Sequence, residues 1–131
     1  MRNHLDTNLL IQQPNWDRLP PGRHELVVSA IVFAEFSEGI THPDPDIAAR
    51  ARLDLIQLRT AYGDGLPFSQ PEADVYRELC AIVSAAGKTA GGRGGVDLMI
   101  AAVAVADNAA LATRNPSDFT GLESVLEVMQ L

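Results

Sequence analysis

The sequence predicts an α/β fold in which helices cover both faces of a central, mostly parallel β-sheet. Short apolar segments rich in β-branched residues alternate with longer segments of helical periodicity along the chain. Hydrophobic residues make up 47% of the 131 residues and charged residues 21%, which is typical of a globular protein. Since no repeat, low-complexity tract or linker divides the chain, we expect residues 1–131 to form a single domain, a three-layer α/β/α sandwich.

Prolines, glycines and polar residues divide the first half of the chain into elements. The polar residues 2–4 precede Leu5, so the first strand is either very short or unusual at its entry. The β-branched residues of ELVVS predict a second strand, and the apolar run stopped by Gly39 predicts a helix after it. Asp46 is the expected cap of the next helix. The predicted elements are a strand ending at Leu5-Asp6, a helix over 7–13, a proline-rich loop over 15–23, a strand over 25–29, and helices over 30–40 and 47–62.

A glycine-rich segment, GGRGG at residues 91–95, is predicted to be a flexible loop between two helices in the second half. The glycines at 63 and 65 end the preceding helix, and acids after Pro71 favour the start of another. The predicted elements are a possible strand over 66–69, helices over 71–86 and 96–108, a strand over 109–113, a turn over 114–119, and a strand over 124–129.

Four acidic residues interrupt or end apolar runs where such a sheet would turn from strand to helix or loop. Asp97 is the only polar side chain in VDLMIAAVAVA, and Glu35 follows LVVSAIVFA. A buried, unpaired charge costs several kcal/mol, so such a residue caps a helix, pairs with a cation or binds metal. In open parallel sheets, functional groups gather beyond the carboxyl ends of the strands. We therefore expect Asp6, Glu35, Asp97 and Asp118 to converge.

A set of converging carboxylates would suit Mg²⁺ or Mn²⁺, which prefer oxygen ligands. We expect Asp6 and Asp97 to hold the principal ion, and Glu35 and Asp118 to complete a second or outer site. Without metal, these like charges would raise one another's pKa values. Taken singly, each aspartate is also explained as a helix cap or turn residue, whereas Glu35 inside a helix has no capping role but could pair with an arginine.

Other classes of protein are disfavoured by composition. The formal net charge of −7 argues against broad attraction to nucleic acid, although bound divalent cations would offset part of it. The three histidines form no i, i+4 pair and have no cysteine partner, which disfavours zinc. No apolar stretch is long enough for a membrane span and the N-terminus lacks the apolar core of a signal peptide, so we expect a cytoplasmic protein.

Four motifs stand in order along the chain: Leu5-Asp6-Thr7-Asn8, Ser29 to Glu35 with Gly39, Asp97 to Ala102, and Thr113 to Phe119. Together they resemble the motifs of the PIN domain family, and most closely those of its VapC toxins from bacterial toxin–antitoxin pairs. The resemblance covers nearly the whole chain. DTN alone would be a weak signal, whereas D-x-x-I-A-A followed by T-R-N-x-x-D-F is specific.

The resemblance implies a PIN fold and a Mg²⁺- or Mn²⁺-dependent endoribonuclease. It assigns the catalytic, metal-binding site to Asp6, Glu35, Asp97 and Asp118, with Asn115 and Thr7 as polar supports. It also implies a homodimer and a VapB-like antitoxin whose tail blocks the active-site groove. Two alternatives remain open: a non-catalytic PIN-like module that binds RNA or protein, and a PIN nuclease of RNA processing without toxicity.

Overall fold

The computed structural model describes residues 1–12, 14–88 and 92–131. Within them, four strands form one sheet in the order β2-β1-β3-β4, and each pair of neighbouring strands is parallel. The strands are β1 (Arg2–Leu5), β2 (Glu25–Val27), β3 (Ala110–Thr113) and β4 (Val128–Gln130). The prediction of an α/β fold with a parallel sheet is confirmed.

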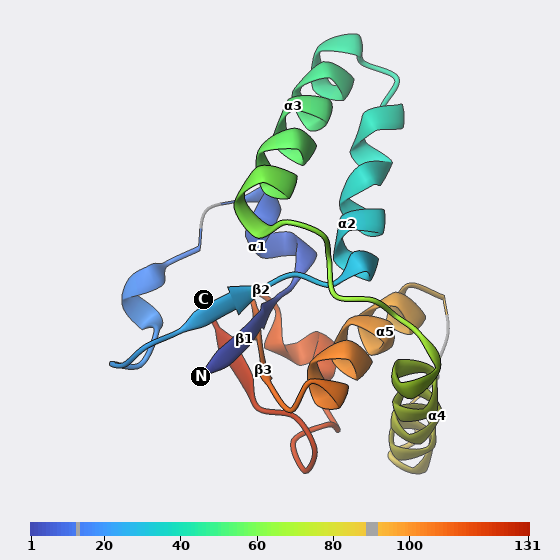
Figure 1. Ribbon diagram of the computed structural model, residues 1–131. Coiled ribbons are helices and arrows are strands. Elements are labelled where there is room, and N and C mark those ends of the chain that lie inside the picture. Colours follow the sequence, from blue (N-terminus) through green and yellow to red (C-terminus); the bar gives the residue numbers. More distant parts are fainter. Residues whose placement is uncertain (13, 89–91) are drawn as a thin grey trace.

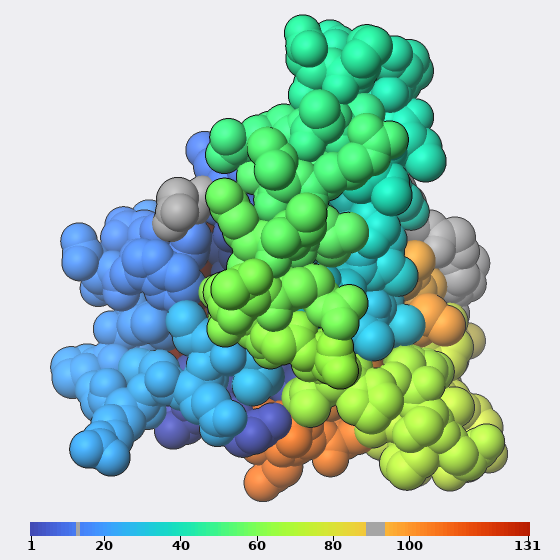
Figure 2. Space-filling view, turned by 45° about the horizontal axis from the view of Figure 1, so that its top comes forward, coloured from blue at the N-terminus to red at the C-terminus, as the bar shows by residue number. Residues whose placement is uncertain are grey.

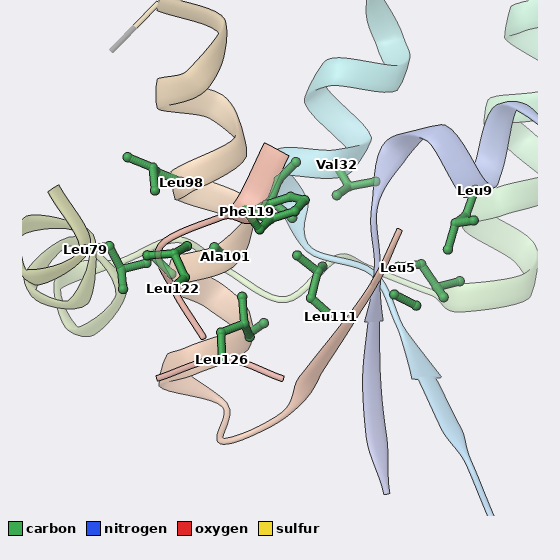
Figure 3. Packing of buried hydrophobic residues seen from close by; sticks show 14 of the residues in the cluster. Leu5, Leu9, Val32, Leu79, Leu98, Ala101, Leu111, Phe119, Leu122 and Leu126 are labelled. Atoms are coloured by element: carbon green, nitrogen blue, oxygen red, sulfur yellow. The ribbon is translucent and has the colours of Figure 1, made fainter. Parts of the chain in front are cut away.

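Helices cover both faces of this sheet. They are α1 (Thr7–Ile11), α2 (Ala30–Ser37), α3 (Pro45–Tyr62), α4 (Gln70–Ala85) and α5 (Gly92–Ala106). Figure 1 shows α2 and α3 projecting beyond the carboxyl ends of the strands, with α5 beside the sheet and α4 outside it. Leu5 and Leu9 lie on one side of β1, and Leu111 and Ala101 lie on the other (Figure 3). The predicted three-layer arrangement is therefore confirmed.

Helix α5 is the most deeply buried helical element. Its residues Ile100 to Ala104 are at most 2% exposed, which explains why that segment is apolar all round. Three of these five residues are alanines, whose small side chains allow α5 to pack closely against both β3 and α4. Among the described helices, none combines the length and the apolarity needed to cross a lipid bilayer.

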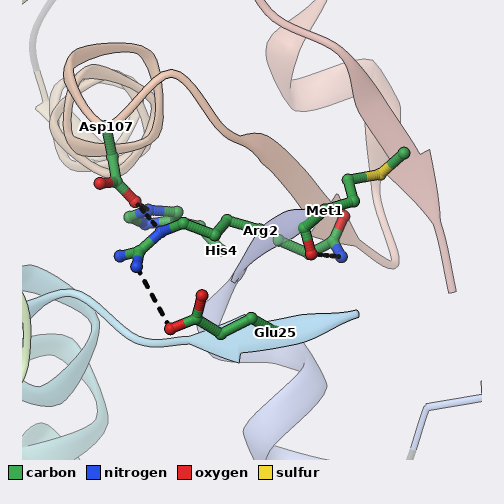
Figure 4. Close-up of polar contacts among 6 residues, drawn as sticks. Met1, Arg2, His4, Glu25 and Asp107 are labelled. Atoms are coloured by element: carbon green, nitrogen blue, oxygen red, sulfur yellow. Dashed lines mark hydrogen bonds and ion pairs between the residues drawn. The ribbon is translucent and has the colours of Figure 1, made fainter. Parts of the chain in front are cut away.

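The polar entry of β1 is buried and hydrogen-bonded. Asn3 and His4 are at most 1% exposed, although both stand in the middle of a parallel sheet. The Oδ2 atom of Asp107, just after α5, lies 2.8 Å from Nε2 of His4 and 2.9 Å from Nε of Arg2. Arg2 also pairs with Glu25 of β2 at 3.2 Å (Figure 4). The first strand is therefore both short, at four residues, and polar at its entry, which were the two alternatives that the sequence left open.

The contacts of Arg2 and His4 with Asp107 join β1 to the end of α5, and the histidine in this cluster is neutral. Burial lowers the pKa of His4, against the opposing effect of the Asp107 carboxylate. Burial alone would raise the pKa of Asp107, but the hydrogen bonds from His4 and Arg2 lower it below its usual value. The neutral His4 ring therefore donates from Nε2 to a charged Asp107, and its Nδ1 has no partner among the described residues.

Two predictions about helix starts are wrong. The predicted loop at 91–95 is largely helical, since α5 begins at Gly92; Gly91 lies outside the described residues. Glycine disfavours a helix without forbidding it, and the long apolar run that follows anchors this one. The cap of α3 is Asp44 rather than Asp46: Oδ1 of Asp44 accepts a hydrogen bond from the Asp46 backbone at 2.9 Å. Pro45, which lacks an N–H, is well suited to the first helical position.

Three other segments are shorter than predicted. Helix α1 ends at Ile11, and Gln13 of the predicted helix lies outside the described residues. In place of a strand over 66–69, Leu66 forms a single parallel bridge with Ser29. The last strand begins only at Val128, because the segment before it turns back through the hydrogen bond from Leu126 N to Leu122 O, 2.9 Å long.

Candidate active site

A cleft of about 1130 Å³ opens beside the residues that follow β1 and β3. All four predicted acids line it, although they come from four separate segments of the chain. Asp6 follows β1, Glu35 lies on α2, Asp97 lies on α5, and Asp118 lies in a 3₁₀ turn after β3. The expected position at the carboxyl ends of parallel strands explains how residues this far apart in sequence reach one cavity.

Asp6 is the most buried of the four acids, at 4% exposed. It caps α1, because its Oδ1 accepts a hydrogen bond from the Thr7 backbone at 2.8 Å. Its Oδ2 accepts from the Thr113 hydroxyl at 2.7 Å and from the Asn8 amide at 3.3 Å. The capping interpretation is therefore confirmed for Asp6, and it is compatible with a second role because the same residue lines the cleft.

Thr113 is a supporting residue that the sequence-based site does not include. It ends β3, is fully buried, and donates its hydroxyl proton to Asp6. The same oxygen accepts from the Asn8 amide and from the Asn115 backbone, each at 3.1 Å. Asn8 Oδ1 in turn accepts from the Arg114 backbone at 3.1 Å, so this network joins the ends of β1 and β3. In the sequence, the signal for this role was that Thr113 is the one polar residue of ALAT and stands at its end.

The other three acids have different surroundings. Glu35 and Asp97 are partly buried and Asp118 is exposed. Asp97 lies well inside α5 rather than at its first residue, which excludes the capping interpretation for it. Within the described part of the chain Glu35 forms no ion pair, so the alternative of an arginine partner is not supported there.

The two expected polar supports also line the cleft, in different environments. Asn115 is exposed, whereas Thr7 is only 6% exposed. The Thr7 hydroxyl, next to Asp6 in sequence, has no hydrogen-bond partner among the described residues. This oxygen is itself buried, so the role of Thr7 as a polar support stays a prediction.

The charge of Asp6 is disfavoured in this cleft. Burial raises the pKa of its carboxyl group, while hydrogen bonds from Thr113 and the Thr7 backbone oppose the rise. The negative charges of Glu35 and Asp118 raise the pKa further. The expected mutual effect of the acids is confirmed in direction for Asp6, although burial contributes more than the neighbouring charges do.

The donor set fits a hard divalent cation. Carboxylates are the ligands that Mg²⁺ and Mn²⁺ prefer, and a cation would relieve the repulsion at Asp6. As they stand, no three His, Cys, Asp or Glu side chains of the described segments are close enough to hold one ion. Such a group of three is not a precondition, because Mg²⁺ keeps several of its waters and is commonly held by one or two carboxylates.

The chain belongs to the PIN domain family, whose model matches residues 5–120. The match spans all four acids and every motif that carries the resemblance. PIN domains are nucleases that generally use divalent metal ions. A nuclease of this class is consistent with an acidic cleft at the carboxyl edge of a parallel sheet.

Several solved structures from bacteria have a similar fold. VapBC-5 from Mycobacterium tuberculosis has a TM-score of 0.83 at 22% identity, over 99% of this chain and 98% of that one. FitAcB from Neisseria gonorrhoeae has a TM-score of 0.77 at 26% identity, over 98% and 96%. VapBC2 from Rickettsia felis, bound to a promoter DNA fragment, has a TM-score of 0.76 at 23% identity, over 100% and 99%. No curated protein sequence matches this chain.

Proposed function

We propose that this chain is the toxin of a VapBC-type pair and acts as a Mg²⁺- or Mn²⁺-dependent endoribonuclease. The observation that carries the proposal is the meeting of Asp6, Glu35, Asp97 and Asp118 in one cleft of a PIN-family chain. Structures similar along the full length support the pairing, since VapBC-5 is described as a member of a toxin–antitoxin family. Residues 1–131 would act as a single PIN domain.

Hydrolysis of a phosphodiester needs an activated water, neutralised phosphate charge and a stabilised leaving oxygen. One or two divalent ions, when bound, supply these three effects. In the proposed site, Asp6 and Asp97 hold the principal ion, while Glu35 and Asp118 complete the site and orient the attacking water. The Thr113 hydroxyl and the Asn8 amide hold the Asp6 carboxylate in place through their hydrogen bonds.

The proposed partners are an antitoxin, a second copy of the chain and RNA. A VapB-like antitoxin would bind this chain and block the cleft, and two copies of the chain would form a homodimer. The substrate would be cytoplasmic RNA. The VapBC complexes from Rickettsia felis and Salmonella typhimurium are bound to DNA; for this chain, we assign such a role only to the complex with its antitoxin.

The test is incubation of the purified protein with total cellular RNA in Mg²⁺, in Mn²⁺ or with chelator. Asp97→Asn, which keeps the shape of the side chain and removes its charge, is compared with Asp17→Asn. Asp17 is exposed in the short 3₁₀ helix Trp16–Arg18 and does not line the cleft. Metal-dependent cuts that Asp97→Asn loses and Asp17→Asn keeps would support the nuclease. RNA binding without cutting in either metal would instead favour the non-catalytic binding module.

A growth assay in cells distinguishes the two nuclease alternatives, a toxin and an RNA-processing enzyme. A toxin arrests growth when expressed alone, and the product of a neighbouring gene relieves the arrest. A processing nuclease shows neither effect. Growth arrest by Asp97→Asn at the same expression level would contradict a toxicity that depends on cleavage.

A further inference from the structure

Helix α3 forms a wall of the cleft that the proposed metal site does not use. One face of this helix lines the cleft, and its lining residues are Asp46, Ile47, Arg50, Ala51 and Asp54. Their spacing of one, four, five and eight residues places them along one stripe of the helix. In the space-filling view, α3 (green) stands as a ridge on the molecular surface (Figure 2).

This wall carries a cation in an otherwise acidic cavity. The four site acids are joined by Glu38, Asp46 and Asp54, and Arg50 is the only basic side chain among the described lining residues. An RNA strand carries a negative charge at every phosphate. Divalent ions at the four acids would offset charge there, but the acids of α3 would still repel a neighbouring phosphate.

Arg50 forms one exposed ion pair and still has donors to spare. Its Nε lies 3.0 Å from Oδ1 of Asp54, one helical turn away. Its side chain is 73% exposed, whereas that of Asp54 is 33% exposed. Among the described residues, this is the one ion pair that Arg50 forms, and it engages Nε and not the two terminal amino groups. A guanidinium presents these amino groups as a planar fork that matches the geometry of phosphate.

We propose that Arg50 is a substrate-positioning residue, whose guanidinium binds an RNA phosphate next to the one that is cut. This inference rests on the proposed ribonuclease function and extends it to how the substrate is held. The alternative is an ordinary helix ion pair between Arg50 and Asp54, which would stabilise α3 slightly and contact no ligand.

The test compares Arg50→Gln and Arg50→Lys with Arg52→Gln. Arg52 is exposed on the same helix and does not line the cleft, so it is a matched control. The probe is a fluorescent single-stranded RNA pool of randomised sequence. Binding is measured in an Asp97→Asn background in Mg²⁺ over a range of salt, and initial cleavage rates are measured without that substitution. Unfolding midpoints of the variants show that each remains folded.

We expect Arg50→Gln to weaken RNA binding and raise the apparent KM by roughly tenfold, equal to about 1.4 kcal/mol. The kcat should stay within about twofold, because the proposed contact of Arg50 is with a neighbouring phosphate and not with the one that is cut. The slope of log binding constant against log salt should fall by about 0.7, the value for one phosphate on a single strand. Arg50→Lys should be intermediate, since a lysine keeps the charge and loses the fork.

The results that would contradict the role of Arg50 differ from those that would contradict the nuclease. If wild type cuts RNA and Arg50→Gln behaves as Arg52→Gln in affinity and salt slope, the role of Arg50 is refuted and the nuclease stands. A loss of kcat with unchanged binding also refutes it. RNA binding that depends on Arg50 without any cutting supports the phosphate contact and overturns the nuclease. If RNA is neither bound nor cut, both proposals fail.

Discussion

The hydroxyl of Thr113 offers a direct test of how the buried Asp6 carboxylate is held. The substitution Thr113→Val replaces this hydroxyl with a methyl group of similar shape, so no sizeable cavity forms. It removes the 2.7 Å hydrogen bond to Asp6 and the acceptor for Asn8 and Asn115. Thr113→Ser is the matched variant, because it keeps the hydroxyl and removes only the methyl group.

The expected loss of stability follows from these contacts. A hydrogen bond to a charged group contributes about 1.5–3 kcal/mol, and a neutral one about 0.5–1.5 kcal/mol. The Asn8 amide keeps its bond to Asp6, and Asn115 is exposed to water, so part of the neutral loss is recovered. We therefore expect Thr113→Val to lower the free energy of unfolding by about 2–4 kcal/mol. Thr113→Ser should cost about 1 kcal/mol, the value of one buried methyl group.

Urea unfolding at neutral pH measures both variants, provided that their m-values equal that of wild type. The Thr113 hydrogen bond favours the charged form of Asp6, so its loss should raise the pKa of Asp6 further. The cost of Thr113→Val should accordingly shrink as the pH falls and Asp6 becomes protonated. Equal stabilities of the Val and Ser variants, or a cost that does not change with pH, would refute this account.

Three further predictions concern metal, backbone and pH. Mg²⁺ or Mn²⁺ at 100 times its Kd should stabilise wild type by about 2.7 kcal/mol, seen as a higher Tm, and Asp97→Asn should lose most of that shift. Gly65→Ala should lower the free energy of unfolding by about 1–3 kcal/mol, because the added Cβ would lie 2.5 Å from a backbone nitrogen at the start of α2. The Cβ of Gly94→Ala would meet open space in a helix, so this substitution should leave the free energy of unfolding unchanged or raise it by up to about 1 kcal/mol. The free energy of unfolding should fall as the pH drops below about 6.5, because the lowered pKa of His4 makes the folded state bind fewer protons than the unfolded state. It should fall further below about pH 3.8 as Asp107 is protonated, and His4→Leu should remove the first of these two phases.

Each of these predictions has its own contrary outcome. An unchanged Tm in both metals would count against the cation site. Equal effects of alanine at the two glycines would mean that the close approach at Gly65 is not a constraint. A pH profile that His4→Leu leaves unchanged between about 6.5 and 4 would assign the acid sensitivity to other groups.

Local patterns account for what could be predicted from the sequence. Alternating strand-like and helical segments predict a parallel sheet, since parallel strands need helical crossovers. The convergence of Asp6 and Asp118 follows from the same rule, because both come after strands that lie side by side. These inferences need only periodicity and chain order, and both can be read from one sequence.

Long-range pairings explain what the sequence did not reveal. The burial of His4 depends on Asp107, more than a hundred residues away, and Thr113 reaches Asp6 only because β1 and β3 are neighbours. Periodicity carries no information on which polar side chains meet across a sheet. The helical glycines of α5 were missed for a different reason: propensity is a weak prior that tertiary packing overrides.

Asp6 is buried and Asp107 is partly buried, both beside β1, yet their charges have opposite effects on the stability of the fold. Asp107 contacts the guanidinium of Arg2 and the ring of His4, and its pKa is lowered, so its charge stabilises the folded state above about pH 3.8. Among the described residues, Asp6 accepts hydrogen bonds from neutral donors and lies near two further carboxylates; its pKa is raised, so its charge opposes folding. Stability alone would favour an asparagine at Asp6, because that residue keeps a capping oxygen without the charge. In the proposed metal site, a bound cation would offset this charge, which would account for an aspartate rather than an asparagine at this position.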